Sequence, residues 1–226
     1  MFQALYELLF PPTCPVCQQA KPAFHGFLCL GCLADLSFSL RPKGIQPVEK
    51  AFWGRVPVHS AYSWLRFNPQ NRTRDLLHAI KYDQDERLGQ AMGRRFGRDL
   101  LSVIHDPPDL ILPVPLHAKK MKRRGFNQAE AIAKGMSEVL KIPINSTLLS
   151  RTEHQASLTK LSRIDRWERI RSAYQCQSEL LTDVHYMVVD DVITTGATIE
   201  ACVNALLEAG AKKVSVASLA YAERQF

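Results

Sequence analysis

The sequence predicts an α/β fold in which a mostly parallel sheet is covered by helices on both faces, with a small cysteine-rich unit at the amino terminus. Three observations lead to this prediction. Strand-like and helix-like patterns alternate from about residue 109 onward, which is typical of parallel sheets. Two CxxC pairs lie close together near the start of the chain. An apolar run at residues 187–189 leads into two acids and a turn that begins a helical pattern.

Composition narrows the class of protein. The chain has 226 residues, of which 46% are hydrophobic and 23% charged, and these values are ordinary for a globular protein with one sizeable core. No apolar stretch approaches the length of a membrane span. The first residues, 1–12, carry an apolar helical stripe but lack the basic start and cleavage site of a secretory signal, so we expect a cytoplasmic protein. The net charge of +7 favours polyanionic partners: phosphates, nucleic acid or an anionic membrane face.

The amino-terminal cysteines have the spacing of a metal site. Cys14 and Cys17 form the first CxxC pair, and Cys29 and Cys32 form the second. Two such turns can complete a tetrahedral thiolate cage, so we predict a structural Zn²⁺ with no open position for catalysis. Disulfides and redox dithiols are the alternatives. The missing secretion signal argues against disulfides, and a thioredoxin-like site needs only one pair.

The elements follow from apolar periodicity and from local start and stop signals. We expect three parts: a zinc knuckle with a short amino-terminal helix at 1–40, a linker at 41–57, and the α/β domain at 58–226. Asn127 is a suitable N-cap for a helix that ends at Leu140. The other predicted elements of the domain are strand 58–65, helix 69–80, helix 86–104, strand 109–113, strand 147–150, a polar and basic stretch at 151–172, strand 185–189, helix 197–209 and strand 213–219.

The segment 187–201, MVVDDVITTGATIEA, predicts a site for a sugar phosphate. After the strand come Asp190 and Asp191, then a short turn at 192–193. The N–H groups of the turn 194–198 and the positive end of the following helix suit a phosphate, and Gly196 permits close backbone approach. The acids can accept hydrogen bonds from vicinal ribose hydroxyls. The alternative is an ordinary strand–helix turn whose threonines only cap the helix.

This segment closely resembles the phosphoribosyl-pyrophosphate (PRPP) motif of type I phosphoribosyltransferases. The resemblance implies a type I phosphoribosyltransferase-like sheet, PRPP as ligand, and Mg²⁺ bound with it. Asp190 and Asp191 would be the catalytic acids that orient the ribose and help to fix magnesium. The residues implied to bind the 5-phosphate are Thr194, Thr195, Gly196, Ala197 and Thr198.

A basic loop follows the predicted strand 109–113 and leaves the same edge of the sheet. Its prolines make it stiff, and its cations can neutralise a diphosphate. In type I phosphoribosyltransferases the pyrophosphate loop occupies this place in the chain, which implies Pro115, Leu116, His117 and Arg124 as pyrophosphate-binding residues. For the run 117–124 alone, a solvated helix face is the alternative.

Further motifs narrow the resemblance to the ComF family, whose members are associated with natural competence and use of imported DNA. These motifs are FPPTCPVCQ, the Ile80-Lys81-Tyr82 element, PVPLH, RRGFNQAEAIA and RTEHQASL, and they extend over nearly the whole chain. The family pattern implies a flexible anion-contacting loop with Arg151, Gln155 and Arg166. The family usually has an asparagine where this chain has Arg169. For the run 163–171 alone, a solvated helix is again the alternative.

Two functions agree with these patterns. The first is a transferase that moves phosphoribosyl from PRPP to an unknown acceptor and releases pyrophosphate. The second is a non-catalytic PRPP- or nucleotide-binding module that binds single-stranded DNA or a DNA-uptake protein. A purely DNA-binding protein ranks last because it needs no paired acids before the turn. The sequence indicates neither the acceptor nor an oligomeric state.

Overall fold

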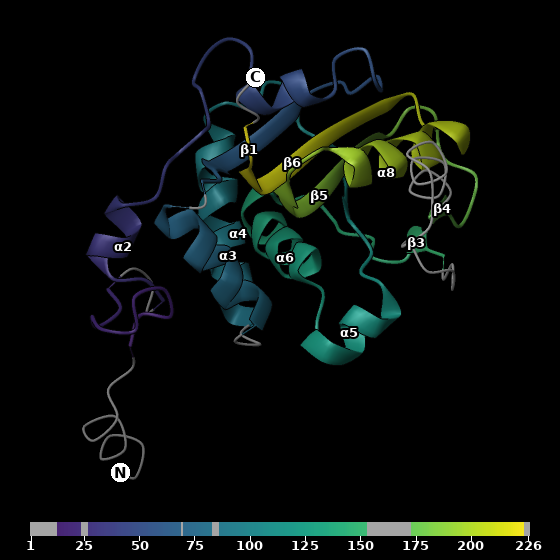
Figure 1. The fold of residues 1–226 in the computed structure, drawn as a ribbon. Coiled ribbons are helices and arrows are strands. Elements are labelled where there is room, and N and C mark those ends of the chain that lie inside the picture. The colour runs from purple at the N-terminus through teal and green to yellow at the C-terminus, as the bar shows by residue number, and fades with distance from the viewer. Residues whose placement is uncertain (1–12, 24–26, 69, 83–85, 153–172, 224–226) are drawn as a thin grey trace.

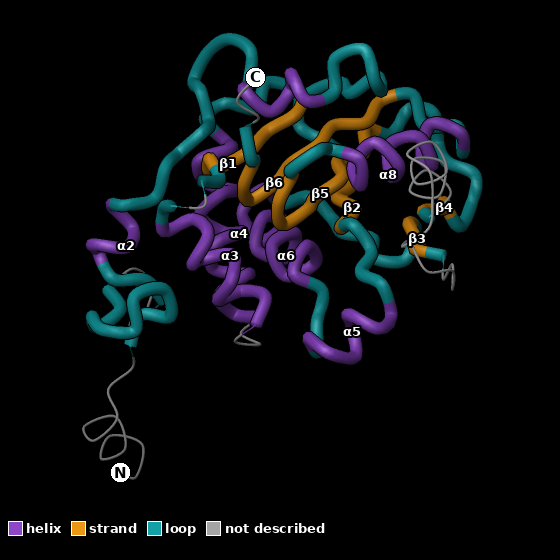
Figure 2. The backbone as a smooth tube through the Cα atoms, in the orientation of Figure 1, coloured by secondary structure: helices purple, strands orange, loops and turns teal. Residues whose placement is uncertain are grey.

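The computed structural model describes residues 13–23, 27–68, 70–82, 86–152 and 173–223. Its centre is a four-stranded sheet in the order β1-β6-β5-β2, and all neighbouring strands are parallel (Figures 1 and 2). The strands are β1 (Ala61–Arg66), β2 (Leu110–Pro113), β5 (His185–Ile193) and β6 (Lys213–Tyr221). The predicted α/β class with a parallel sheet is therefore confirmed.

Helices cover both faces of the sheet, because the strands are apolar on both sides. Helices α3 (Arg72–Tyr82), α4 (Glu86–Leu101) and α6 (Gln128–Leu140) lie on one face, and α8 (Ala197–Glu208) lies on the other (Figure 1). Glycines allow α4 and α6 to pack closely. A Cβ at Gly93 would lie 2.1 Å from the Ile132 carbonyl oxygen, and one at Gly135 would lie 2.0 Å from the Gln90 carbonyl oxygen.

Two smaller elements lie beyond the sheet. Strands β3 (Leu149–Arg151) and β4 (Tyr174–Cys176) form an antiparallel pair, and α5 (Ala118–Arg124) follows the loop after β2. The sequence predicted a strand near β3 but not its antiparallel partner β4, and it offered a helix in the run 117–124 only as the alternative to a loop. Helix α5 forms in the basic run because the His117 side chain caps its start and Gly125 adopts a left-handed conformation at its end.

The amino-terminal segment packs against the edge of the sheet. It contains the short helix α2 (Leu30–Ala34) and the 3₁₀ helix η1 (Pro47–Ala51). The Ser39 N–H donates to the Trp64 carbonyl at 2.8 Å, which adds a short antiparallel pairing to β1. Val48, Phe52 and Val56, from the segment expected to be a linker, are buried in the core. Within the described residues, no helix combines the length and apolar character needed to cross a membrane.

Several boundaries differ from the sequence prediction. Helix α3 begins at Arg72 rather than at residue 69, and α4 ends at Leu101 rather than at residue 104. The largest difference is in β5, which continues to Ile193 instead of ending at Val189. The reason is pairing with β6, because Asp190 to Ile193 lie opposite Ser218 to Tyr221.

Candidate functional site

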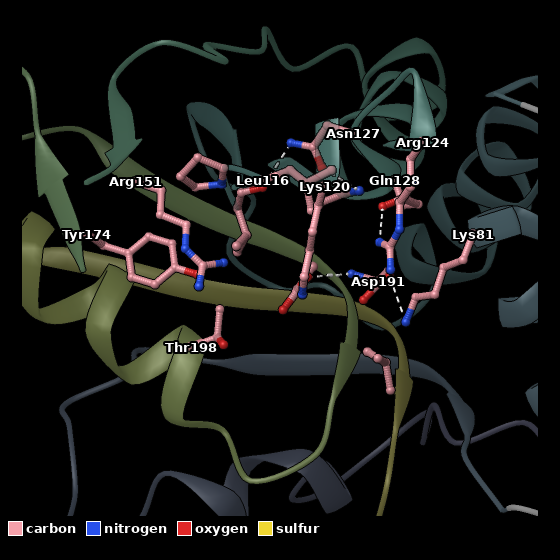
Figure 3. Close-up of a pocket in the computed structure, with 15 residues that line it drawn as sticks. Lys81, Leu116, Lys120, Arg124, Asn127, Gln128, Arg151, Tyr174, Asp191 and Thr198 are labelled. Carbon is pink, nitrogen blue, oxygen red and sulfur yellow. Dashed lines mark hydrogen bonds and ion pairs between the residues drawn. The ribbon is translucent and has the colours of Figure 1, made fainter. Parts of the chain in front are cut away.

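The two acids lie in the last residues of β5, at the carboxyl edge of the sheet. Strand pairing with β6 fixes the backbone of Asp190 opposite Ser218. The Asp191 N–H donates to Oδ1 of Asp190 at 2.8 Å, which holds the first carboxylate against the chain. Both acids line a cleft of about 180 Å³ (Figure 3). The predicted acids therefore share one cavity at the edge where open parallel sheets bind their ligands.

Four cations face the two acids across this cleft. They come from three separate segments: Lys81 lies in the last turn of α3, Lys120 and Arg124 belong to α5, and Arg151 ends β3 (Figure 3). The Lys81 ammonium lies 3.0 Å from Oδ2 of Asp191. Positive charge exceeds negative charge among the described lining residues, so the cleft favours a ligand that carries several negative charges.

The ionisation of the site reflects this crowding. Burial, reinforced by the neighbouring charge of Asp191, raises the pKa of Asp190 to about 7, and Lys81 and Lys120 partly oppose that rise. Burial lowers the pKa of Lys120, as do the nearby charges of Arg151, Arg124 and Lys81. A cation added next to the acids or an anion added next to Lys120 would therefore relieve repulsion.

The predicted pyrophosphate residues divide into two groups. Pro115, Leu116 and Arg124 line the cleft. Arg124 is 9% exposed, and its Nη1 donates to Oε1 of Gln128 at 2.7 Å, which directs the guanidinium along the wall. His117 is not among the lining residues, because its Nδ1 accepts from the Lys119 N–H at 3.1 Å and caps α5.

Asn127 fastens this loop to the sheet. Its Oδ1 accepts from the Ala129 N–H at 3.1 Å, which confirms the predicted N-cap of α6. Its Nδ2 donates to the Val114 carbonyl at 2.9 Å. One side chain thereby fixes both the start of α6 and the end of β2, and the basic helix between them is held at the cleft.

The predicted phosphate turn, residues 194–198, has the left-handed residue that its shape requires. Gly196 has a φ of 79° and precedes the first residue of α8. Thr198 lines the cleft with the acids, whereas Thr194 and Thr195 are exposed and line a second cavity. A further residue lies behind the turn: Nη1 of Arg55 donates to the Thr195 carbonyl at 2.6 Å.

The remaining wall is formed by β3 and β4. The Arg151 guanidinium lies over the Tyr174 ring, 5.3 Å from its centroid. Burial raises the pKa of Tyr174 to about 12, and a hydrogen bond with Thr198 opposes that rise. Of the predicted flexible-loop residues, Arg151 reaches the cleft, whereas Gln155 and Arg166 lie outside the described residues.

Among the ionisable residues that line the cleft, sequence reasoning missed three as site residues: Lys81, Lys120 and Tyr174. Lys81 belongs to a motif that was noted only as a family signature, and Lys120 belongs to the basic run. Tyr174 had no local signal, because it reaches the cleft through the pairing of Arg151 with Tyr174.

The four amino-terminal cysteines form one cluster. Their sulfur atoms all lie within 4.8 Å of one another, and the Cys17 and Cys29 sulfurs are 3.8 Å apart. All six cysteines of the chain are free. A tetrahedral ion with metal–sulfur bonds of ~2.3 Å places its sulfurs ~3.8 Å apart, so this arrangement fits a metal ion.

The cluster also favours thiolates. Hydrogen bonds from the backbone N–H groups of Ala20 and Gln19 lower the pKa of Cys17 to about 6, whereas burial raises the pKa of Cys32. The Cys32 N–H donates to the Cys29 sulfur at 3.3 Å. One thiolate is thus available at neutral pH, and a bound cation would favour ionisation of the others.

Comparisons with known proteins show which proteins the chain resembles. The phosphoribosyl transferase domain family matches residues 122–225. The chain is 31% identical to "DNA utilization protein YhgH" of Escherichia coli O157:H7 over 210 residues, which cover 90% of this chain and 87% of the relative. It is 33% identical to "Competence protein F" of Haemophilus influenzae over 117 residues, 51% of each chain.

A solved structure provides a further likeness. Glutamine PRPP amidotransferase from Bacillus subtilis, complexed with ADP and GMP, superposes with a TM-score of 0.42. The sequence identity is 22%, and the match covers 58% of this chain and 26% of the other.

Proposed function

We propose that the cleft binds PRPP together with Mg²⁺. The chain belongs to the ComF family of competence and DNA-utilization proteins and carries a phosphoribosyltransferase-like domain, and both facts favour this ligand. One observation carries the proposal. Two adjacent acids at the end of β5 share a cleft with Lys81, Lys120, Arg124 and Arg151. PRPP has the matching chemistry, because it joins a diol to phosphates at both ends.

Each part of the ligand has a complementary part of the cleft. Asp190 and Asp191 would accept hydrogen bonds from the ribose hydroxyls and help to hold magnesium. The N–H groups of residues 194–198 would bind the 5-phosphate, with the Thr198 hydroxyl on the cleft side. Arg124, Lys120 and the loop at Pro115 and Leu116 would receive the diphosphate.

If the chain is an enzyme, these groups would act mainly by position and charge. Displacement of pyrophosphate at the anomeric carbon builds negative charge on the departing diphosphate, where the cations of α5 lie. Mg²⁺, when bound, would neutralise part of that charge. Arg151, over the ring of Tyr174, would close the opposite side of the cleft.

A thermal-shift measurement with Mg·PRPP tests the binding proposal. At a ligand concentration 100 times the Kd, binding should stabilise the folded protein by ~2.7 kcal/mol. The double substitution Asp190→Asn with Asp191→Asn should abolish that stabilisation. The control is Asp183, an exposed acid two residues before β5. Asp183→Asn should keep the stabilisation by Mg·PRPP. A wild-type protein that shows no shift at millimolar Mg·PRPP would contradict the proposal.

The second candidate is a binding module without catalysis, and the basic helix favours it. Helix α5 presents Lys119, Lys122 and Arg123 to solvent beside the cleft, which suits the backbone of single-stranded DNA or an acidic face of a DNA-uptake protein. Pyrophosphate release should be measured over a panel of nucleobases and amines. Release with one acceptor supports the transferase, whereas PRPP binding without release from any acceptor supports the module.

For the cysteine cluster we propose a structural Zn²⁺. Four sulfurs at tetrahedral spacing and the absence of other ligand types favour zinc over harder ions. None of the six cysteines forms a disulfide, which agrees with the reducing conditions of the cytoplasm. We also keep the division into a knuckle at 1–40 and a phosphoribosyltransferase-like domain from residue 58 as part of this proposal.

A further inference from the structure

A second cavity lies on the other flank of the phosphate turn. Its volume is about 380 Å³, and it is bounded by the segment from Pro47 to Arg55, by Thr194 and Thr195, and by the chain after β6. Of the described residues that line it, none also lines the acid-bearing cleft. The turn therefore separates two cavities, and we name this one the Trp53 cavity.

Trp53 is the largest side chain that lines this cavity. Trp53 is 59% exposed, whereas Phe52 beside it is 2% exposed and Val48 is fully buried. The chain thus buries the neighbours and directs one large aromatic side chain outward, into a cavity. Aromatic side chains in such positions are the platforms on which single-stranded nucleic acids stack their bases.

The polar groups around the indole suit the rest of a nucleotide. Lys50 and the hydroxyls of Thr194 and Thr195 can donate hydrogen bonds to a phosphate. Glu223, whose carboxylate lies 3.6 Å from Nε of Arg66, can accept from an amino group or a ring N–H of a base. One side of the cavity therefore suits an anion and another suits a ring with hydrogen-bond donors.

Arg55 connects this cavity to the phosphate turn. Its Nη1 donates to the Ala51 carbonyl at 3.0 Å and to the Thr195 carbonyl, and its Nη2 forms an ion pair with Glu200 of α8. The guanidinium also lies against Gly196, because a Cβ at that position would meet Nη1 at 3.3 Å. A ligand on the Trp53 side would thus touch the back of the turn that faces the cleft.

We infer that the Trp53 cavity binds one nucleotide of a single-stranded nucleic acid, with the base stacked on the indole and the phosphate held by Lys50 and the two threonine hydroxyls. The inference rests on the proposed function in one respect, because it places a nucleic-acid strand beside the proposed PRPP site. The binding itself does not require PRPP.

Fluorescence anisotropy with a labelled oligothymidylate of about ten nucleotides tests the inference. Trp53→Ala should weaken strand binding about tenfold, which corresponds to ~1.4 kcal/mol of lost stacking, and Trp53→Phe should retain most of the affinity. Leu181→Ala removes another exposed apolar side chain, which does not line the cavity, and should change nothing. A strand of the same length without bases should bind wild type and Trp53→Ala equally.

Competition with free thymine distinguishes the two sources of a base. If free thymine displaces the oligonucleotide, the cavity binds an isolated base. If it does not, the cavity binds a base only as part of an oligonucleotide. Equal strand affinities of wild type and Trp53→Ala, or no strand binding by the wild type, would overturn the inference.

The Mg·PRPP thermal shift of the same variants separates this inference from the proposed function. Trp53→Ala should keep the shift of the wild type. If the wild type shows no shift but binds the strand through Trp53, the proposed function fails and the cavity remains a nucleotide site. If the shift is present but strand binding ignores Trp53, only the inference fails.

Discussion

Strand β5 carries ionisable side chains at both ends, and the two ends differ in how their charges are compensated. At its start, His185 is 3% exposed, and its Nε2 lies 2.7 Å from the Ser215 hydroxyl oxygen. Asp106 lies beside it and pairs with both Lys213 and His59. At its end, Asp190 and Asp191 lie next to each other, and four cations share their cleft.

The carboxylate at the amino end of the strand is therefore paired with cations of the fold, whereas the cations at the carboxyl end outnumber the acids. Neighbours lower the pKa of Asp106, chiefly through a hydrogen bond from Lys213, so its charge is favoured by the fold. Burial and Asp191 instead raise the pKa of Asp190. Ionisable groups whose pKa values are shifted by burial and by neighbouring charges are typical of functional sites, so the carboxyl end is the better candidate for a bound ligand.

The cysteine cluster also brings together groups of one type, four sulfur atoms. Its disruption should lower stability more than any other change proposed for this chain. Cys32→Ser removes a buried ligand from the cluster. Structural zinc contributes ~10–16 kcal/mol to the folding of small zinc domains, so the variant should lose its metal and the order of the knuckle. Metal analysis by mass spectrometry should find about one zinc per wild-type chain and none in the variant.

Cys176→Ser is the matched control for this prediction. Cys176 lies outside the cluster and its sulfur donates to the Ser178 carbonyl at 3.2 Å, a contact that serine can reproduce. This variant should keep its zinc and its melting temperature. Zinc retained after Cys32→Ser, with unchanged stability, would show that the four sulfurs do not form one site.

Two lysines test the difference between the ends of β5 directly. Lys120 is repelled by other cations in the cleft, whereas Lys213 pairs with Asp106. Lys120→Gln should weaken Mg·PRPP binding about tenfold, as expected for a lost charged hydrogen bond, without lowering the melting temperature of the free protein. Lys213→Gln should lower the melting temperature and leave PRPP affinity unchanged. Calorimetric titration with Mg·PRPP and thermal melts of both variants are the measurements. A lower melting temperature in Lys120→Gln together with weaker PRPP binding in Lys213→Gln would contradict the proposed difference between the two ends of β5.

Much of the fold was predictable because its signals are local. Apolar runs predicted β2, β5 and β6, and Asn127 predicted the start of α6. The extension of β5 to Ile193 was not predictable, because it depends on pairing with a strand from a distant part of the sequence. The β3–β4 pair was missed for the same reason.

The candidate site shows the same division between local and distant contributions. The strand that carries Asp190 and Asp191 is adjacent in sequence to the Gly196 turn, so one motif predicted both. Lys81 and Tyr174 enter the cleft from distant segments, which no single motif describes. His117 was predicted at the diphosphate, but the structure uses its ring as a helix cap.

Arg55 allows a smaller test at the back of the phosphate turn. Arg55→Ala removes the hydrogen bond to the Thr195 carbonyl and the ion pair with Glu200. The N–H groups of the turn should then be held less firmly in position. The affinity for ligands with a 5-phosphate should fall severalfold, as for the loss of a hydrogen bond worth ~1 kcal/mol. Ribose 5-phosphate and PRPP should be affected alike, whereas pyrophosphate affinity should not change.

Glu200→Gln supplies the control for this role. The neutral amide can still accept from Arg55 and keep it near Thr195, so this variant should lose less affinity than Arg55→Ala. A loss of pyrophosphate affinity equal to that of ribose 5-phosphate would show that Arg55 acts on the whole cleft rather than on the turn.

The smallest effect concerns pH and the start of β5. Burial, aided by the charge of Lys213, lowers the pKa of His185 below its usual 6.5, although Asp106 opposes this. The unfolded chain therefore binds a proton at this residue more readily than the folded chain. Stability from His185 is complete above pH 6.5 and is lost as pH falls toward the lower pKa of the folded state.

As the pH falls from about 7 to 5, the contribution of His185 to the free energy of unfolding should therefore decrease, by no more than ~1.4 kcal/mol per pH unit for one proton. Asp190, whose pKa is raised to about 7, contributes a slope of the opposite sign in the same range. His185→Gln keeps a polar partner for Ser215 but cannot titrate, so denaturant melts of this variant should lose the contribution of His185 to the slope and keep that of Asp190. His105→Gln, at an exposed position, should keep the wild-type slope. The carboxylate of Asp106 titrates below this range because its pKa is lowered, so it adds no slope here. An unchanged slope in His185→Gln would mean that the pKa of His185 is the same in the folded and the unfolded chain. The two ends of β5 would then differ in the arrangement of their charged groups but not in how the amino end resists protonation.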